Sequence, residues 1–282
     1  MTTPTPFISF AQNGEDVILN RALVDVESGR YIDVGANHPT DDSVTRSFYN
    51  RGWSGVAIEP NPSFATQFRA ERPRDIVVEA AVTDTPDPTA TFHIIEGTGL
   101  STLVDSISAD HAGKGYAVTD LTVPTMRLDT AIEESGLGDT DLHFLVIDTE
   151  GAEDQVLRSI DFTKHRPWIL VIEATTPGTT LASHLEWEAL VLNAGYEFCL
   201  FDGLSRYYVA EEMSAKLKPA LSYPACIFDA YITAREQRLR SDLESTKHRA
   251  AEAERLLSAM VQSNSWKMTG PLRSIRRRFR QR

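Results

Sequence analysis

Acidic side chains end several short apolar runs of this sequence, and two of them suggest a nucleoside site. Asp33 lies in the run Tyr31–Asn37, which reads Tyr-Ile-Asp-Val-Gly-Ala-Asn, and Glu59 directly follows the apolar run Val56–Ile58. The ends of neighbouring parallel strands meet at one edge of a sheet, and Gly35, without a Cβ, lets the backbone approach a ligand there. A carboxylate at Glu59 can accept hydrogen bonds from both ribose hydroxyls. The two acids together favour a nucleoside of little negative charge, such as S-adenosylmethionine, although either acid alone could be a helix cap.

A second group of carboxylates could carry the chemistry. Asp148 and Glu150 directly follow the apolar run Phe144–Ile147, and Glu173 ends a later apolar run. Such carboxylates can orient a hydroxyl group, take its proton or hold a hard divalent cation. We expect Asp148 to be the general base, supported by Glu150 and Glu173; no tight ligand spacing indicates a metal ion, so no metal site is assigned. In the structural alternative, Asp148 or Thr149 caps the following helix, which is compatible with function.

Two histidines offer imidazole as another base. His38 directly follows the glycine loop, whereas His143 lies at the start of its strand, away from the acids. A structural or surface role is the other interpretation of each.

The glycine loop lacks the motifs of folds that bind pyrophosphate. Gly35 is not followed by the second and third glycines of G-x-G-x-x-G, and G-x-x-x-x-G-K-[ST] is absent. A nicotinamide oxidoreductase is therefore excluded.

Short β-rich runs alternate with helical segments along most of the chain. This alternation predicts an α/β fold with a doubly wound, mostly parallel sheet, which would place the acids at one edge. We expect strands at Tyr31–Val34, Gly55–Ile58, Ile76–Ala81, Phe144–Ile147, Ile169–Ile172, Glu197–Leu200 and Cys226–Ala230. We expect helices at Ser43–Asn50, Pro62–Arg72, Ala152–Ser159 and Leu181–Ala194. The irregular segment from Asp84 to Thr130 could be an insertion or a lid, with short strands at Thr91–Ile95 and Thr122–Pro124.

The distribution of charge divides the chain into two parts. The net charge is −12 over 282 residues, but residues 1–233 hold 15 basic and 35 acidic groups, whereas residues 234–282 hold 13 basic and 5 acidic groups. An acidic body is poorly suited to nucleic acid, whose binding requires clustered Lys and Arg. We therefore expect an α/β domain over residues 1–233, a helical basic tail over residues 234–282 and no nucleic-acid partner.

Nothing in the sequence indicates export or a membrane span. The longest apolar run is the five residues Trp168–Ile172, far short of a bilayer. Residues 1–10 lack the basic start and long apolar stretch of a secretory signal. The two cysteines, Cys199 and Cys226, are too few for a disulfide framework. A cytoplasmic location is expected.

The tail carries a repeating apolar pattern of its own. Spacings of four and three alternate between Leu239, Leu243, Thr246, Ala250, Ala253, Leu257 and Met260, as in the seam of a coiled coil. Because the seam is short and contains Thr and two Ala, a homodimer and a lone amphipathic helix both remain open.

Six segments in fixed order carry a resemblance to a known family. They are Ser9–Asp16, Asp33–Asn37, Glu59–Pro62, Ala80–Val82, Leu128–Thr130 and Ile147–Glu153. With them the chain resembles the FkbM family of S-adenosylmethionine-dependent methyltransferases, from about residue 7 to about residue 232. The last segment, Ile-Asp-Thr-Glu-Gly-Ala-Glu, makes the ordered set of motifs fairly specific to this family.

The resemblance implies a class I methyltransferase fold over residues 1–233, Rossmann-like, with a seven-stranded sheet whose last strand is antiparallel. It also implies methyl transfer from S-adenosylmethionine to oxygen, commonly a sugar hydroxyl of a glycan, glycolipid or glycosylated natural product. In the cofactor site, the methionine part would be lined by Asp33, Gly35 and Asn37 with Ala36 between them, the ribose by Glu59, and the adenine by Ala81 with Asp84 nearby. Two residues of the opening segment would close over the site, Gln12 and Glu15.

The chain departs from the family pattern at two positions. Val146 stands where many relatives have Lys before the Ile-Asp-x-Glu-Gly run, and Ala11 immediately precedes Gln12 in place of the serine. The missing lysine supports an alternative hypothesis, a non-catalytic scaffold of a polysaccharide-assembly complex.

The end of the tail carries a further resemblance. Residues Asn264–Arg273 resemble a motif at the C-termini of bacterial enzymes of surface-polysaccharide assembly, including glycosyltransferases. This implies a cell-envelope glycan as acceptor, and contact of the tail with a glycosyltransferase or with the inner face of the membrane. A solvated basic end is the alternative.

Overall fold

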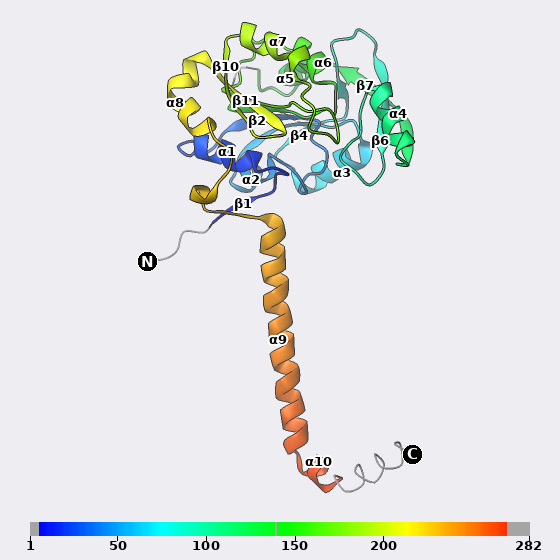
Figure 1. Cartoon of the computed structure of the whole chain (residues 1–282), viewed down its shortest axis with the longest axis vertical. Coiled ribbons are helices and arrows are strands. Elements are labelled where there is room, and N and C mark those ends of the chain that lie inside the picture. The colour runs from blue at the N-terminus through cyan, green and yellow to red at the C-terminus, as the bar shows by residue number, and fades with distance from the viewer. Residues whose placement is uncertain (1–5, 139, 270–282) are drawn as a thin grey trace. The chain divides into compact units, whose positions relative to one another are not determined.

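The computed structural model describes residues 6–138 and 140–269. The chain divides into two compact units, Met1–Tyr231 and Ile232–Arg282 (Figure 1). Each unit is described by itself.

The first unit is built on a seven-stranded sheet. Its order is β10 (Tyr196–Phe201), β11 (Ser205–Ala210), β9 (Ile169–Glu173), β8 (Phe144–Ile147), β2 (Arg30–Val34), β3 (Ser54–Ile58) and β4 (Ile76–Val78). β11 is antiparallel to β9 and to β10, and the other pairs are parallel. The first strand of this sheet along the chain, β2, lies between β3 and β8, so the strand order reverses there and opens a crevice at the carboxyl ends of these strands. The expected class I sheet with an antiparallel last strand is confirmed.

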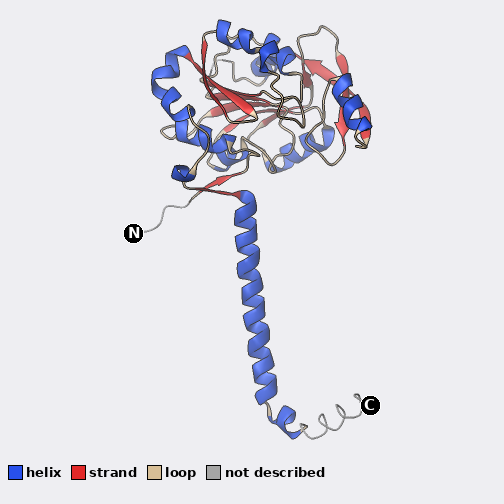
Figure 2. Ribbon diagram, viewed as in Figure 1, coloured by secondary structure: helices blue, strands red, loops and turns tan. Residues whose placement is uncertain are grey.

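Alternating side chains of the strands supply two separate cores. In β8, Leu145 and Ile147 belong to one core, and Phe144 and Val146 belong to the other, as the period of two in a strand requires. Figure 2 shows the sheet between helical layers. The first core packs against α5 (Leu128–Glu134), α6 (Glu153–Arg158) and α7 (Glu188–Asn193). The second packs against α1 (Glu15–Ala22), α2 (Arg46–Asn50) and α8 (Glu211–Leu221). α3 (Pro62–Glu71) buries Phe68 in a small third cluster.

The irregular segment forms a small sheet of its own. Its order is β5 (Ala81–Val82), β7 (Val118–Met126) and β6 (Thr89–Ile95), and α4 (Asp105–Gly113) joins β6 to β7. The two short strands expected here are parts of β6 and β7.

Three expectations for the elements are corrected. The apolar segment Cys226–Ala230 is no strand: Ile227–Asp229 forms a 3₁₀ turn, η2, because the Asp229 carboxylate accepts the Cys226 N–H and also pairs with Arg21. The run Ile76–Ala81 is divided between β4 and β5, which belong to different sheets.

The third correction concerns the expected helix Leu181–Ala194. It begins only with the 3₁₀ turn η1 (His184–Glu186), followed by α7. Leu181 and Leu185 are exposed, so the apolar spacing there did not mark a core-facing helix.

The second unit consists mainly of α9 (Ala234–Gln262), followed by α10 (Asn264–Met268). Thr233 caps α9, since its hydroxyl accepts the Glu236 N–H. Two further strands, β1 (Phe7–Ser9) and β12 (Tyr231–Thr233), complete the elements. Within the described ranges, no helix combines the length and apolar character needed to cross a bilayer. The arginine-rich end of the tail, residues 273–282, lies outside the described residues.

Candidate cofactor and catalytic site

A cavity opens where β2, β3 and β8 end. Its empty volume is about 1170 Å³, including the part open to solvent. The wall includes every residue expected around the methionine and ribose, Asp33, Gly35, Ala36, Asn37 and Glu59. Gln12, Ala81, Asp148 and Glu150 also line it. Residues from distant parts of the sequence therefore meet at the predicted edge of the sheet.

The loop after β2 requires glycine at one position. Gly35 has a φ of +79°, and a Cβ there would lie 1.8 Å from the carbonyl oxygen of Asp148. The N–H groups of Gly35 and Ala36 both donate to the carbonyl oxygen of Ile58. Gly35 thus lets the ends of β2, β3 and β8 approach one another, which brings their acids around one cavity.

Asp33 and Glu59 are buried and held in place by the protein. The hydroxyl of Thr45 donates to Asp33 over 2.7 Å, and the N–H groups of Asn37 and Asn61 each donate to a different oxygen of Glu59 over 2.7 Å. Burial raises the pKa of Glu59 to about 8, and it also raises the pKa of Asp33. Each Glu59 oxygen retains a lone pair for a ribose hydroxyl.

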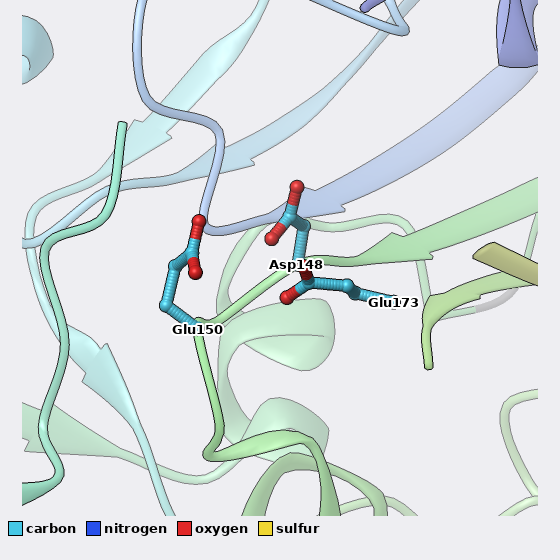
Figure 3. Close-up of side chains that lie close together, drawn as sticks. All are labelled: Asp148, Glu150 and Glu173. Atoms are coloured by element: carbon cyan, nitrogen blue, oxygen red, sulfur yellow. The ribbon is translucent and has the colours of Figure 1, made fainter. Parts of the chain in front are cut away.

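Asp148, Glu150 and Glu173 form a cluster of carboxylates (Figure 3). One oxygen from each lies within 4.8 Å of the others. Asp148 and Glu150 follow β8, and Glu173 is the last residue of β9. Burial raises the pKa of all three. Repulsion is the next cause, mainly from Glu153 for Asp148 and mainly from Asp148 for Glu150 and Glu173. Glu173 adjoins the cavity through this cluster and is not among the residues that line it.

The helix after β8 is not capped by the residues that the sequence suggested. Neither Asp148 nor Thr149 is the N-cap of α6; that position is Ala152, without a side-chain cap. The carboxylate of Glu153 instead accepts the N–H groups of Thr149 and Gly151 over 3.1 and 3.0 Å. The interpretation of Asp148 as the helix cap was therefore wrong, and its carboxylate is not engaged in capping α6.

Glu150 adopts an uncommon backbone conformation. Its φ is +52°, a left-handed conformation that costs a residue with a side chain roughly 1–3 kcal/mol. The hydroxyl of Thr102, from the segment between β6 and α4, donates to the Glu150 carbonyl oxygen over 2.8 Å. Strain of this kind persists where the surroundings fix it, and here it turns the side chain of Glu150 toward the cavity.

Other expected residues lie elsewhere. Glu15 is buried at the start of α1, where it accepts the Asn13 N–H, and it does not line the cavity. Asp84 does not line it either. The ring of His38 accepts N–H groups of its own loop. His143 accepts the Arg30 N–H at the start of β2, the end of the sheet away from Asp148.

The small outer sheet contributes a wall that the sequence did not identify in detail. Phe92, Leu100 and Leu103 line the cavity together with Gly99 and Ser101, as does Phe64 of α3. The sequence marked the run Gly97–Thr102 either as a flexible turn or, by its resemblance to a family segment, as an approach to the active site. This segment therefore adds apolar side chains to the wall that the acidic strand ends also line.

Comparisons with known proteins give a family match and several similar solved structures. The model of the methyltransferase FkbM domain matches residues 33–198, more than half of the chain. Among curated proteins, none matches this sequence. Similar solved structures include a TehB-like SAM-dependent methyltransferase from Corynebacterium glutamicum, with 8% identity, a TM-score of 0.38 and coverage of 71% of this chain and 88% of that chain. Another is precorrin-6y C5,15-methyltransferase from Geobacter metallireducens, with 13% identity, a TM-score of 0.37 and coverage of 69% and 86%. On the family match, the chain belongs to the FkbM family and is an S-adenosylmethionine-dependent methyltransferase.

Proposed function

We propose that the protein transfers a methyl group to a hydroxyl oxygen of a sugar-containing acceptor, either a glycan, a glycolipid or a glycosylated natural product. The observation that carries this proposal is the carboxylate cluster around Asp148, which adjoins the predicted cofactor wall in one cavity. Transfer to oxygen requires the removal of a proton from the acceptor, and a carboxylate beside the methyl donor can accept it.

The cavity suits S-adenosylmethionine in charge and in shape. No Lys, Arg or His lies among the described residues that line it, whereas Asp33, Glu59, Asp148 and Glu150 do. A cofactor with a net positive charge fits such a wall, and pyrophosphate does not. Two side chains in the wall can still accept hydrogen bonds from it. Glu59 retains one lone pair on each oxygen, and among the described residues only one oxygen of Asp33 accepts a hydrogen bond. When bound, the cofactor supplies a methyl group on a cationic sulfur, which an oxygen can displace in line.

In this proposal, each part of the cofactor is bound by its own set of residues. Asp33, Gly35, Ala36 and Asn37 hold the methionine part, Glu59 holds the ribose and Ala81 lies against the adenine. Gln12 closes over the cofactor from the N-terminal segment. We propose no direct cofactor contact for Glu15 or Asp84, because neither lines the cavity.

Asp148 is the proposed general base. A carboxylate with an ordinary pKa near 4 is a weak base for a sugar hydroxyl. Burial and the neighbouring acids raise the pKa of Asp148 to about 7, which makes its carboxylate a stronger proton acceptor. The repelling acids are Glu153 and Asp33, whereas the hydrogen bond with Glu173 lowers the pKa of Asp148. Glu150 and Glu173 orient the acceptor.

The tail and the cellular setting complete the proposal. The tail would join two copies of the chain, or contact a glycosyltransferase or the inner membrane face, with the protein in the cytoplasm. Support comes from the apolar seam of α9, whose leucines are exposed, and from the two cysteines, both free thiols.

Calorimetry with S-adenosylmethionine tests the cofactor site. We expect the unaltered protein to bind and Glu59→Ala to bind at least about tenfold more weakly, because two charge-assisted hydrogen bonds are lost. Glu79→Ala is the matched control: Glu79 directly follows β4 as Glu59 follows β3, but it pairs with Arg69 on the surface. Equal binding by Glu59→Ala and Glu79→Ala would contradict the assignment.

Labelled methyl groups test the acceptor class. Transfer of label from S-adenosylmethionine to a purified lipid-linked glycan, with loss of transfer in Asp148→Asn, is expected. Cofactor binding without transfer to any hydroxyl-bearing glycan would favour the scaffold hypothesis instead.

A further inference from the structure

The carboxylate cluster carries more negative charge than its surroundings balance. Asp148, Glu150 and Glu173 each place an oxygen within 4.8 Å of the others, and Figure 3 shows the three carboxyl groups turned toward one another. No basic side chain lines the adjoining cavity among the described residues. The guanidinium of Arg72, which is fully buried, is engaged by Asp75 and Thr45.

Two oxygens of the cluster are buried without a partner. Glu173 is only 6% exposed, and its Oε2 accepts no hydrogen bond from the part of the chain that the structure describes. The Oε2 atom of the half-buried Glu150 is likewise buried and accepts none there. Buried carboxylate oxygens are normally hydrogen-bonded, paired or bound to a metal, because leaving them bare is costly. Backbone N–H groups satisfy the nearby Glu153 and Glu59 instead. The bare oxygens therefore set this cluster apart from the other acids of the cavity.

We propose that Asp148, Glu150 and Glu173 bind one hard divalent cation, Mg²⁺ or Mn²⁺, and that this ion positions the acceptor hydroxyl. The inference rests on the proposed function, whose acceptor it places. Three carboxylate oxygens are the ligands that such ions prefer, and they leave positions of an octahedral shell open for water and for the acceptor oxygen. The ion also offsets two of the three negative charges of the cluster.

The bound ion changes how the hydroxyl loses its proton. A metal-bound hydroxyl is a stronger acid than a free one, and its proton passes to the Asp148 oxygen that does not bind the metal. The acceptor oxygen then forms its bond to the methyl carbon. The sulfur–carbon bond breaks, and its electron pair returns to sulfur, which becomes neutral.

Electron paramagnetic resonance with MnCl₂ on the full chain tests the site directly, because bound Mn²⁺ loses the sharp signal of the free ion. We expect one Mn²⁺ per chain, displaced by MgCl₂. Glu173→Gln should weaken binding at least about tenfold, as the loss of a ligand does. Glu150→Gln is a second variant, and thermal unfolding checks that both are folded.

Asp42→Asn is the matched control. Asp42 lines the same cavity but is not part of the cluster, so this variant should bind Mn²⁺ as the unaltered protein does. The proposal is overturned if the unaltered chain binds no stoichiometric Mn²⁺, in which case the carboxylates merely share protons. Equal binding by Glu173→Gln and Asp42→Asn also overturns it.

Calorimetry with S-adenosylmethionine separates this inference from the proposed function. Cofactor binding and label transfer that persist in full after treatment with EDTA would overturn the metal site and leave the methyl transfer standing. Stoichiometric Mn²⁺ binding without cofactor binding would support the site and contradict the methyl transfer.

Discussion

Gly35 is the residue on which the meeting of the three strand ends depends most directly. Gly35→Ala would place a Cβ 1.8 Å from the Asp148 carbonyl oxygen, in addition to the strain of φ +79°. We expect loss of cofactor binding in calorimetry and a fall in stability well beyond the roughly 1–2 kcal/mol of a left-handed alanine. Gly52→Ala is the control, since Gly52 has φ +97° but nothing within 4 Å of its added Cβ. Similar losses of stability in the two variants would show that strain alone, and not the contact with Asp148, accounts for the effect.

The buried acids predict how stability depends on pH. Burial raises the pKa of Glu15 and of Glu59 to about 8, from ordinary values of 4.5. A carboxyl with a raised folded pKa keeps its proton in the folded state after the unfolded chain has released it. Its contribution is therefore full below about pH 4.5 and is lost as the pH rises through 8. We expect the melting temperature of the apoprotein to fall between pH 5 and pH 9.

Glu15→Gln tests the contribution of one of these acids to the pH dependence without altering the cavity, because Glu15 does not line it. The variant should flatten the dependence of melting temperature on pH. Glu212→Gln should leave it unchanged between pH 6 and pH 9, since Arg166 lowers the pKa of Glu212 and keeps it ionised throughout. A melting temperature that rises with pH in the unaltered protein would contradict the burial of these acids.

At the scale of elements, one buried ion pair ties the end of α3 to two strands of the sheet. Arg72, directly after α3, donates to Asp75 over 2.8 Å and to the Thr45 hydroxyl that in turn holds Asp33. Asp75 also accepts the Gly55 N–H of β3 and the Tyr31 hydroxyl of β2. The network therefore fixes the side chain of Asp33, the carboxylate that we propose contacts the cofactor.

Removing one partner of this pair should be costly. We expect Arg72→Met to lower the free energy of unfolding by about 3–5 kcal/mol, because it leaves Asp75 buried and unpaired, as measured by urea denaturation. Arg74 lies two residues after Arg72 in the sequence, is exposed and stacks on the Tyr49 ring. Arg74→Met should lower the free energy of unfolding by less than about 1 kcal/mol. A cost for Arg72→Met as small as that of Arg74→Met would show that solvent relieves the charge of Asp75.

The same scale shows what the sequence could predict. Buried parallel strands are continuous apolar runs, so β2, β3, β8 and β9 were predictable. β11 was missed although Asp202-Gly203, between two runs rich in β-formers, indicates a hairpin turn. The turn at Ile227–Asp229 and the Arg72 network were not predictable, because each depends on side chains far apart in the sequence. At the site the acids were foreseen, but the hydrogen bonds by which Glu153 accepts the Thr149 and Gly151 N–H groups depend on side-chain geometry.

At the scale of the whole molecule, the open question is what covers the apolar seam of α9. Leu243 and Leu257, both on the seam, are 53% and 54% exposed. Flanking positions of the same repeat also carry a pattern of charge. In the heptad repeat of the seam, Leu243, Ala250 and Leu257 occupy the position called a. In a parallel pair of helices in register, the residue just before each a position faces the residue five places further along in the second copy. Asp242 then faces Lys247, Arg249 faces Glu254, and Leu256 faces Val261. The first such pair, Arg235 and Arg240, has like charges, but Glu236 pairs with Arg240 within the helix.

This complementarity predicts a parallel homodimer whose strength depends on charge. Analytical ultracentrifugation of the full chain should show a dimer that Asp242→Lys weakens about tenfold, because two symmetric pairs change from attraction to repulsion, about 1.4 kcal/mol together. Lys247→Asp should weaken it similarly, and the double variant Asp242→Lys/Lys247→Asp should restore it with exchanged signs. Glu252→Lys, the same charge change on a face directed away from the seam, should have little effect. If the double variant associates no better than the single ones, the helices do not pair in this register; if the unaltered chain is monomeric, α9 is a lone amphipathic helix.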